Sequence, residues 1–141
     1  MIVAASKQDC EAIYSLMNEL EAGALDHQDF IKQYEKCMAD KNVFVYLYKD
    51  DEIKGCITLY IHHYLHHRQP TGEIGELIVK EKYRNQHIGE QLLRYVEERA
   101  VLLGLEEISL SSGMKRINAH RFYERHDYIK DHFCFEKKLD K

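Results

Sequence analysis

The stretch Glu73-Ile-Gly-Glu-Leu-Ile-Val-Lys-Glu-Lys-Tyr-Arg-Asn-Gln-His-Ile-Gly-Glu-Gln-Leu-Leu93 decides the fold of this chain of 141 residues. It begins as a β-rich run that ends at Val79. From Ile88 onward, apolar side chains recur at the spacing of one helix face as far as Leu103. The connection between these two parts is short and polar. The sequence therefore predicts a strand, a tight loop and a long helix in direct succession.

The polar loop of this stretch, Arg84–Gly89, has the features of an anion site. A strand that feeds a turn and then a helix directs free N–H groups and the positive end of the helix dipole toward the turn. Gly89 allows a ligand close to the backbone, and Arg84 can donate charge-assisted hydrogen bonds. An ordinary helix start with a surface arginine explains the same spacing equally well. The loop has neither the Gly-Lys-Ser/Thr ending of a Walker loop nor the three glycines of a dinucleotide fingerprint.

Shorter elements are predicted on both sides of this stretch. Before it we expect a strand over 2–5, helices that start at Ser6–Asp9 and at the N-cap Asp26, and a hairpin of strands 43–48 and 53–64. After it we expect a strand over 107–111, a helix over 117–125 and a last strand or strand pair over 128–139. This order has no repeat and no linker, so we expect one α+β domain over residues 1–141.

Composition and charge narrow the classes of function. The formal net charge is −4 and the basic residues form no stripe, which argues against a nucleic-acid or membrane-surface partner. The N-terminus has no basic segment followed by a long apolar run, so we expect no signal peptide. The four cysteines are scattered, as is typical of reduced thiols, and we expect a cytoplasmic protein.

Two segments resemble the GCN5-related N-acetyltransferase (GNAT) family. Leu77-Ile-Val79, Arg84, Ile88-Gly89 and Leu92-Leu93 are similar to its acetyl-CoA segment, and Ala119-His-Arg-Phe-Tyr-Glu-Arg-His-Asp-Tyr128 is similar to its Ala-x-x-x-Tyr-Glu-Lys-x-Gly-Phe/Tyr signature. His87 and Asp127 stand where the family usually has glycine, and Arg116 stands where an asparagine often contacts CoA. The resemblance implies a single GNAT-type domain with a mixed, mostly antiparallel central sheet flanked by helices.

The resemblance also implies acetyl-CoA as cosubstrate and a primary amine of a small molecule as acceptor. The backbone of Leu77–Val79 is expected to pair with the pantetheine arm as an added strand would. A main-chain N–H there is expected to stabilise the oxyanion. The residues that the resemblance assigns to acetyl-CoA are Leu77, Ile78, Val79, Arg84, Asn85, Gln86, His87, Ile88, Gly89, Glu90, Arg116, Ala119 and Phe122.

The reaction needs a base, because an alkylamine with a pKa of about 10 is mostly protonated at neutral pH. By resemblance Glu73 stands where several family members carry the base, and Glu76 is the second candidate. Residues three apart on a strand face opposite sides unless a bulge intervenes, and the family has such a bulge. Either carboxylate is also explained by a structural ion pair. Tyr123 is expected to be the general acid toward the CoA thiolate, with core packing beside Phe122 as the alternative.

A closer resemblance, to the aminoalkylphosphonate N-acetyltransferases within the family, rests on pieces spread along the chain. They are Asp26-His27, His66-His67, Gly72-Glu-Ile-x-Glu-Leu77, Lys115-Arg116, Ala119-His-Arg-Phe-Tyr123 and His132-Phe133. We expect the histidines among them, His66, His67 and His132, to bind the acceptor. The spacing of His62/His66 and of His63/His67 suits a metal on a helix, but this segment is expected to be a loop, so no metal site is assigned and a divalent metal is left open.

Other functions stay open at this point. The acceptor could instead be an amino sugar, a polyamine, an antibiotic or a protein amine, because acceptor loops vary within the family. A non-catalytic acyl-CoA sensor is favoured by His87 and Asp127 and disfavoured by Glu73, Glu76 and Tyr123. A homodimer is also left open, because terminal strands of this family often pair or exchange.

Overall fold

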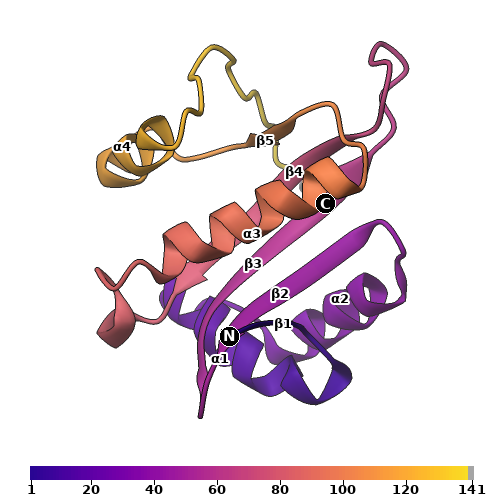
Figure 1. The fold of residues 1–141 in the computed structure, drawn as a ribbon. Coiled ribbons are helices and arrows are strands. Elements are labelled where there is room, and N and C mark those ends of the chain that lie inside the picture. Colours follow the sequence, from indigo (N-terminus) through magenta and orange to yellow (C-terminus); the bar gives the residue numbers. More distant parts are fainter. Residues whose placement is uncertain (140–141) are drawn as a thin grey trace. The chain divides into compact units, whose positions relative to one another are not determined.

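The structure is a computed structural model that describes residues 1–139 in two compact units. The first unit comprises Met1–Ser109 and contains nearly all of the regular structure, and the second begins at Leu110. Figure 1 shows the elements of each unit. None of the helices in residues 1–139 is both long and apolar enough to cross a bilayer.

A five-stranded sheet with the order β1-β2-β3-β4-β5 organises the first unit. Strands β1 to β4 are antiparallel neighbours. The Glu106 N–H donates to Pro70 O (2.8 Å) and the Gly72 N–H to Glu107 O (2.9 Å), so β4 and β5 advance in the same direction. The sheet is therefore mixed and mostly antiparallel, as predicted. Its strands are β1 (Ile2–Ala4), β2 (Val43–Lys49), β3 (Ile53–His62), β4 (Thr71–Val79) and β5 (Ile108–Leu110).

Helices α1 (Cys10–Leu20) and α2 (His27–Ala39) cover one face of this sheet (Figure 1). The predicted N-cap Asp26 accepts a hydrogen bond from the Asp29 N–H at 2.9 Å, which satisfies one of the free donors at the start of α2. A short 3-10 turn (Lys7–Asp9) precedes α1. The buried core on this face consists of Ile13, Leu16, Tyr34, Val45, Leu47, Cys56 and Ile78.

Helix α3 (Ile88–Leu102) covers the opposite face of the sheet (Figure 1). Its stripe of Leu92, Leu93 and Val96 is fully buried, as are Ile57 and Leu59 of β3. Gly104 has a φ of 72° and ends the helix region, as the sequence predicted. The apolar side chains that recur from Ile88 onward thus form the surface that packs α3 against the sheet.

The second unit contains helix α4 (Ile117–Arg125), at the predicted position. The last strand expected over residues 128–139 is wrong: this segment has no regular secondary structure. Its alternating apolar side chains Ile129, Phe133 and Phe135 are 83%, 84% and 92% exposed. A strand persists only when its backbone pairs with a neighbour, and these residues have no pairing strand in the described single chain.

A β-bulge interrupts the pairing of β3 with β4. Ile57 lies opposite Leu77 and Leu59 lies opposite Ile74, so Gly75 and Glu76 share the single residue Thr58. The extra residue shifts which side chains of β4 point to each face of the sheet. As a result, the two carboxylates three positions apart, Glu73 and Glu76, face the same side, toward α1 and α2.

Gly75 makes this bulge sterically feasible. A Cβ atom at this position would lie 2.4 Å from a ring carbon of Tyr60 and 3.0 Å from the Thr58 hydroxyl. We predict that Gly75→Ala lowers the free energy of unfolding by about 1–2 kcal/mol, because overpacking outweighs the entropy that alanine removes from the unfolded chain. Urea unfolding followed by circular dichroism measures this change.

Gly113→Ala is the control for this substitution, because a Cβ atom there would meet its nearest neighbour at 3.7 Å. Gly113→Ala should leave the midpoint of urea unfolding unchanged or raise it slightly. Equal effects of the two substitutions would show that the close approach of Gly75 to Tyr60 is not what requires glycine.

Candidate active site

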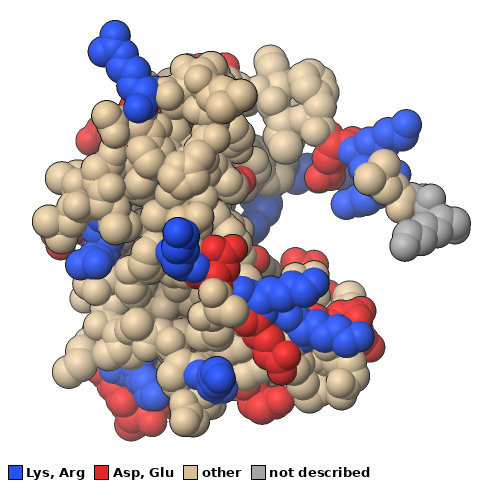
Figure 2. Space-filling view, turned by 90° about the vertical axis from the view of Figure 1, so that its right-hand side faces the viewer, with Lys and Arg blue, Asp and Glu red and all other residues tan. Residues whose placement is uncertain are grey.

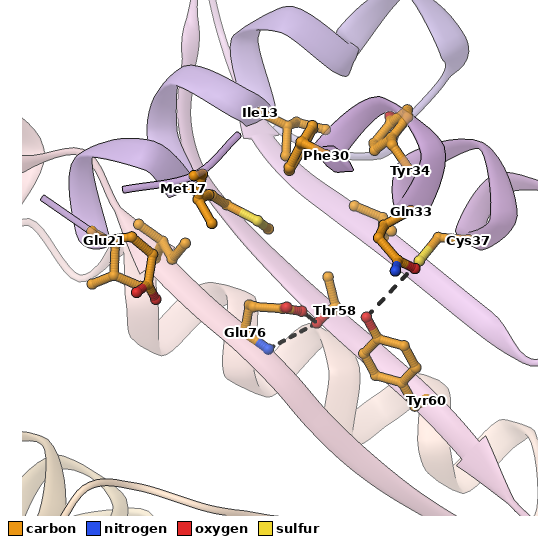
Figure 3. Close-up of a pocket in the computed structure, with 14 residues that line it drawn as sticks. Ile13, Met17, Glu21, Phe30, Gln33, Tyr34, Cys37, Thr58, Tyr60 and Glu76 are labelled. Atoms are coloured by element: carbon orange, nitrogen blue, oxygen red, sulfur yellow. Dashed lines mark hydrogen bonds between the residues drawn. The ribbon is translucent and has the colours of Figure 1, made fainter. Parts of the chain in front are cut away.

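The bulge directs Glu76 into a cavity of about 200 Å³ between the sheet and helices α1 and α2 (Figure 3). Most of the lining is apolar, from side chains such as Met17 and Phe30. The polar part of the lining consists of carboxylate, amide and hydroxyl groups. All of the lining belongs to the described residues, and it includes no Lys or Arg. Such a site suits a small cation with an apolar body. The polar lining residues are Glu21, Gln33, Tyr34, Thr58, Tyr60 and Glu76.

Glu76 is held by the residue opposite the bulge. Its backbone N–H donates to Thr58 Oγ1 at 2.8 Å, and the Thr58 hydroxyl donates in turn to Glu76 Oε1. Figure 3 shows the carboxylate lying over the sheet and directed toward the Thr58 side chain. A carboxylate held in this way can accept the proton of an ammonium group that enters the cavity.

The far wall of the cavity holds two weak acids, Tyr60 and Cys37. Their side chains approach to 4.0 Å between the phenol oxygen and the sulfur. Burial raises the pKa of the Tyr60 phenol, and the nearby negative charge of Glu76 raises it further. Burial is also the main cause that raises the pKa of the Cys37 thiol. Both groups therefore stay neutral at physiological pH and add no charge to the cavity.

Glu73 lies on the same face but outside the cavity lining. Its Oε1 is 2.8 Å from His62 Nε2, and the two side chains are 41% and 34% exposed. This arrangement is a solvent-accessible pair, whereas Glu76 faces an apolar enclosure. The structure thus brings both sequence candidates to one side of the sheet but into different surroundings.

The edge of β4 beyond the bulge is open for another extended chain. The Lys80 N–H donates to Lys54 O of β3 at 2.8 Å, so the alternating backbone groups of Leu77 and Val79 point away from β3. Strand β5 begins beside Gly72 and contains three residues, which is too short to reach Leu77. Both residues belong to the segment Leu77–Val79 that was predicted to pair with the pantetheine arm, and the Val79 carbonyl also accepts from Arg84 Nε.

The loop between β4 and α3 has two residues in the left-handed conformation, Asn85 (φ 63°) and His87 (φ 64°). His87 is the N-cap of α3, whose first turn presents N–H groups that have no acceptor within the helix. Arg84 Nε donates to Val79 O at 3.2 Å, which ties the start of the loop to the end of β4. The predicted diphosphate segment therefore has the geometry of an anion site, with Gln86, Ile88, Gly89 and Glu90 in the same turn.

The loop is braced from the other side by Glu52, in the β2–β3 turn. Its carboxylate accepts a hydrogen bond from the Tyr83 phenol and ion pairs with Lys80 at 3.2 Å and Lys82 at 3.3 Å. The bond from Tyr83, followed by those from the lysines, lowers the pKa of Glu52 to about 2. The carboxylate is therefore ionised at physiological pH, and it connects the hairpin to the segment that leads into α3.

The predicted acceptor histidines His66 and His67 lie in the β3–β4 connection. His66 is exposed, whereas His67 Nδ1 lies 2.5 Å from Glu106 and 3.5 Å from Glu107. Glu106 also accepts the N–H groups of Arg68 (3.0 Å) and Gln69 (3.2 Å), and its bond with His67 is the main cause that lowers its pKa. His67 and the two glutamates have the ligand types of a cation site. Their contacts are equally explained by a structural role, since they hold the β3–β4 connection to the segment before β5.

The remaining predicted residues belong to the second unit. Tyr123 and Phe122 are neighbours on α4 with ring centroids 5.3 Å apart, and burial raises the pKa of the Tyr123 phenol while the charge of Arg116 opposes the rise. Arg116 and Ala119 line an open hollow of about 350 Å³ at the start of α4. His132 is exposed and bonds to its neighbour Asp131 at 2.6 Å.

Sequence reasoning did not identify Thr58, Tyr60 or Cys37 as site residues. Thr58 had one recognisable signal, since it is the only hydroxyl residue within the apolar run Cys56–Leu59. A buried hydroxyl requires a hydrogen-bond partner, which makes such a residue a candidate for a polar contact. Tyr60 and Cys37 have no comparable signal, because aromatic and thiol side chains also fill ordinary cores.

The left-handed conformation of His87 explains why the family usually has glycine there. We predict that His87→Gly raises the free energy of unfolding by about 0.5–1 kcal/mol, because relief of the left-handed strain exceeds the extra entropy of glycine. His87→Ala keeps the strained φ and removes only the ring, so it should not stabilise the protein. Thermal unfolding of the two variants measures the difference, and equal stabilisation by both would contradict the strain explanation.

Positive and negative side chains are interspersed on the face that Figure 2 presents, in accordance with the net charge of −4. A charge distribution of this kind provides no continuous basic stripe on that face for a polyanion.

The chain is similar in sequence and in fold to known proteins. The model of the acetyltransferase (GNAT) family matches residues 10–128. The aminoalkylphosphonate N-acetyltransferase of Salmonella typhimurium is 40% identical over 136 residues, which cover 96% of this chain and 88% of that protein. Two solved structures share the fold over 99% of both chains: a transcriptional regulator from Bacillus halodurans (TM-score 0.92, 22% identity) and the aminoglycoside 6'-N-acetyltransferase AAC(6')-IG from Acinetobacter haemolyticus (TM-score 0.82, 17% identity). The chain therefore belongs to the GNAT family and is an N-acetyltransferase that uses acetyl-CoA as cosubstrate.

Proposed function

We propose that this enzyme acetylates the primary amine of a small molecule, an aminoalkylphosphonate. The name of the Salmonella relative supports this class of acceptor. The observation that carries the chemistry is the Glu76 carboxylate, which projects into a small cavity from the bulge that adjoins the open edge of β4. A base and a binding edge for the donor are thus neighbours on one strand.

In the proposed mechanism, Glu76 accepts a proton from the acceptor ammonium, so that the neutral amine can attack. Acetyl-CoA, when bound, supplies the activated acetyl group. A backbone N–H of the segment Leu77–Val79 stabilises the negative charge that develops on the thioester oxygen. Tyr123, assigned by the resemblance, donates a proton to the departing thiolate, since a phenol is protonated at physiological pH.

Glu76 is our choice of base over Glu73 because of their surroundings. Glu76 lines the cavity, whereas Glu73 pairs with His62 outside it. Glu73 then serves at the rim, where the His62 ring can donate to an anionic part of the acceptor when it is protonated. The other acetyl-CoA and acceptor residues assigned by resemblance, including His66, His67, His132 and Arg116, stay part of this proposal.

A second class of acceptor is favoured by the charge of the cavity lining. Because no Lys or Arg contributes to the enclosed part, it can hold an ammonium and a short apolar or hydroxylated chain without an anion. A polyamine or an amino sugar meets that description. In the leading proposal, by contrast, the phosphonate stays outside the cavity, near the histidines of β3 and its connection to β4.

Three further proposals concern the whole chain. We propose one functional domain over residues 1–141 and a cytoplasmic location, which the free cysteines Cys10, Cys37, Cys56 and Cys134 support. We also propose a homodimer through the C-terminal segment, because its apolar side chains Ile129, Phe133 and Phe135 are exposed in the described chain.

The acceptor class is tested with compounds that differ only in the anion. We expect 2-aminoethylphosphonate to release CoA thiol from acetyl-CoA with a higher kcat/KM than propylamine, since the charged donors outside the cavity add binding energy. Thiol release measured with and without a chelator gives both rates and tests for a metal. Equal rates, or faster turnover of spermidine or glucosamine, would replace the phosphonate by the second acceptor class.

The base is tested by removing one carboxylate charge at a time. We predict that Glu76→Gln lowers kcat/KM at pH 7 by about 100-fold, within the range of a general base, and that Glu73→Gln has a much smaller effect. Glu98→Gln, an exposed position on α3, is the control. The loss in Glu76→Gln should shrink as the pH approaches 10, where about half of the free amine is already neutral.

A larger loss for Glu73→Gln than for Glu76→Gln would assign the base to Glu73. Unchanged binding of CoA by both variants, measured by calorimetry, would show that the losses arise in the transfer step.

A further inference from the structure

We infer that Thr58 is a positioning residue for the reaction: its hydroxyl holds the Glu76 carboxylate in the orientation from which it accepts the acceptor proton. The inference rests on the proposed role of Glu76 as base. It concerns a residue on β3, whereas the donor edge Leu77–Val79 belongs to β4. Thr58 acts through Glu76 and is not itself assigned a step of the chemistry.

The hydroxyl of Thr58 bridges the main chain and the side chain of one residue. It accepts the Glu76 N–H at 2.8 Å and donates its single proton to Glu76 Oε1. A bridge of this kind ties the carboxylate to its own backbone, so it restricts rotation about the side-chain bonds of Glu76. The carboxylate keeps further lone pairs, on both oxygens, with which it can accept from the acceptor ammonium.

The bulge explains why a side chain is needed at this point. Thr58 is the single β3 residue that faces the two residues Gly75 and Glu76, so the regular ladder is broken there. The hydroxyl accepts the N–H that would otherwise bond to a β3 carbonyl. Gly75 leaves room for this contact, because a Cβ atom there would stand 3.0 Å from the hydroxyl oxygen.

The surroundings of Thr58 show that its hydroxyl has a specific use. The residue is 3% exposed, and its neighbours Ile57 and Leu59 are completely buried. A hydroxyl in such a place is costly unless it is hydrogen-bonded, and valine would fill nearly the same volume in the strand. Threonine is β-branched, so its χ1 rotation is restricted and the hydroxyl is held in a narrow range of orientations.

The rival explanation is that Thr58 only closes the bulge and stabilises the sheet. Thr58→Val removes the hydroxyl and preserves the shape, and Thr58→Ser keeps the hydroxyl and removes the methyl group. Thr71→Val is the matched control, since Thr71 is a buried threonine (5% exposed) of the same sheet that bonds to neither candidate base. Thermal unfolding of all three shows the structural part of each effect.

The test measures kcat and KM with acetyl-CoA and the best acceptor of the panel. For Thr58→Val we expect kcat/KM at pH 7 to fall by about 10- to 100-fold with the KM for acetyl-CoA unchanged, as a misoriented catalytic group produces. Thr58→Ser should retain most of the activity. The deficit of Thr58→Val should shrink toward pH 10, where the amine loses its proton without a base.

A purely structural role would give a deficit that does not depend on pH and that Thr71→Val shares in proportion to its loss of stability. That result, or full activity of Thr58→Val at pH 7, would overturn the inference.

The double variant Thr58→Val/Glu76→Gln separates this inference from the proposed function. If Thr58 acts through Glu76, adding Thr58→Val to Glu76→Gln should cause no further loss of activity. Full activity of Glu76→Gln alone would refute the base assignment, and the inference would fall with it. An inactive Glu76→Gln together with a fully active Thr58→Val would leave the proposed function intact and refute only the role of Thr58.

Discussion

The β-bulge opposite Thr58 is the constraint on which the rest of the site depends. One extra residue in β4 places Glu73 and Glu76 on the same face, although a regular strand would separate them. The bulge requires Gly75, because any side chain there would collide with Tyr60. It also requires a hydrogen-bond acceptor on β3, which the Thr58 hydroxyl provides. A local irregularity in the ladder thus directs a carboxylate into the cavity between the sheet and helices α1 and α2.

The sheet separates the two regions to which we assign the substrates. On one side, α3 packs against the sheet through Leu92, Leu93 and Val96, and its start presents N–H groups beside the open end of β4. On the other side, α1 and α2 enclose the cavity that contains Glu76. The backbone edge of Leu77–Val79 adjoins both regions, so a donor arm on this edge would reach the bulge. A layer of buried apolar side chains therefore lies between the N–H groups at the start of α3 and the carboxylate of Glu76.

The charges of the site follow the same division. Neutral hydroxyl and thiol groups surround Glu76, since burial raises the pKa of Tyr60 and Cys37 and prevents them from ionising. Ionised pairs lie outside, where water can solvate them, as in the brace between Glu52 and the lysines before α3. The histidines of the β3–β4 connection are also outside the cavity, and His67 is engaged by Glu106. The enclosed part of the site is thus suited to a cation, and the histidines outside it are paired with glutamates.

The sequence alone determined most of the elements and the family. Helical spacing and the capping residue Asp26 predicted the helices, because local hydrogen bonding and the period of apolar residues are encoded over a few positions. The loop Arg84–Gly89 was recognisable for the same reason. The predicted last strand was wrong, because a strand depends on a partner that alternation within residues 128–139 does not supply. Only the tertiary structure decided which face Glu76 takes and that Thr58 holds it, because the register of β3 against β4 is set by contacts between residues far apart in the chain.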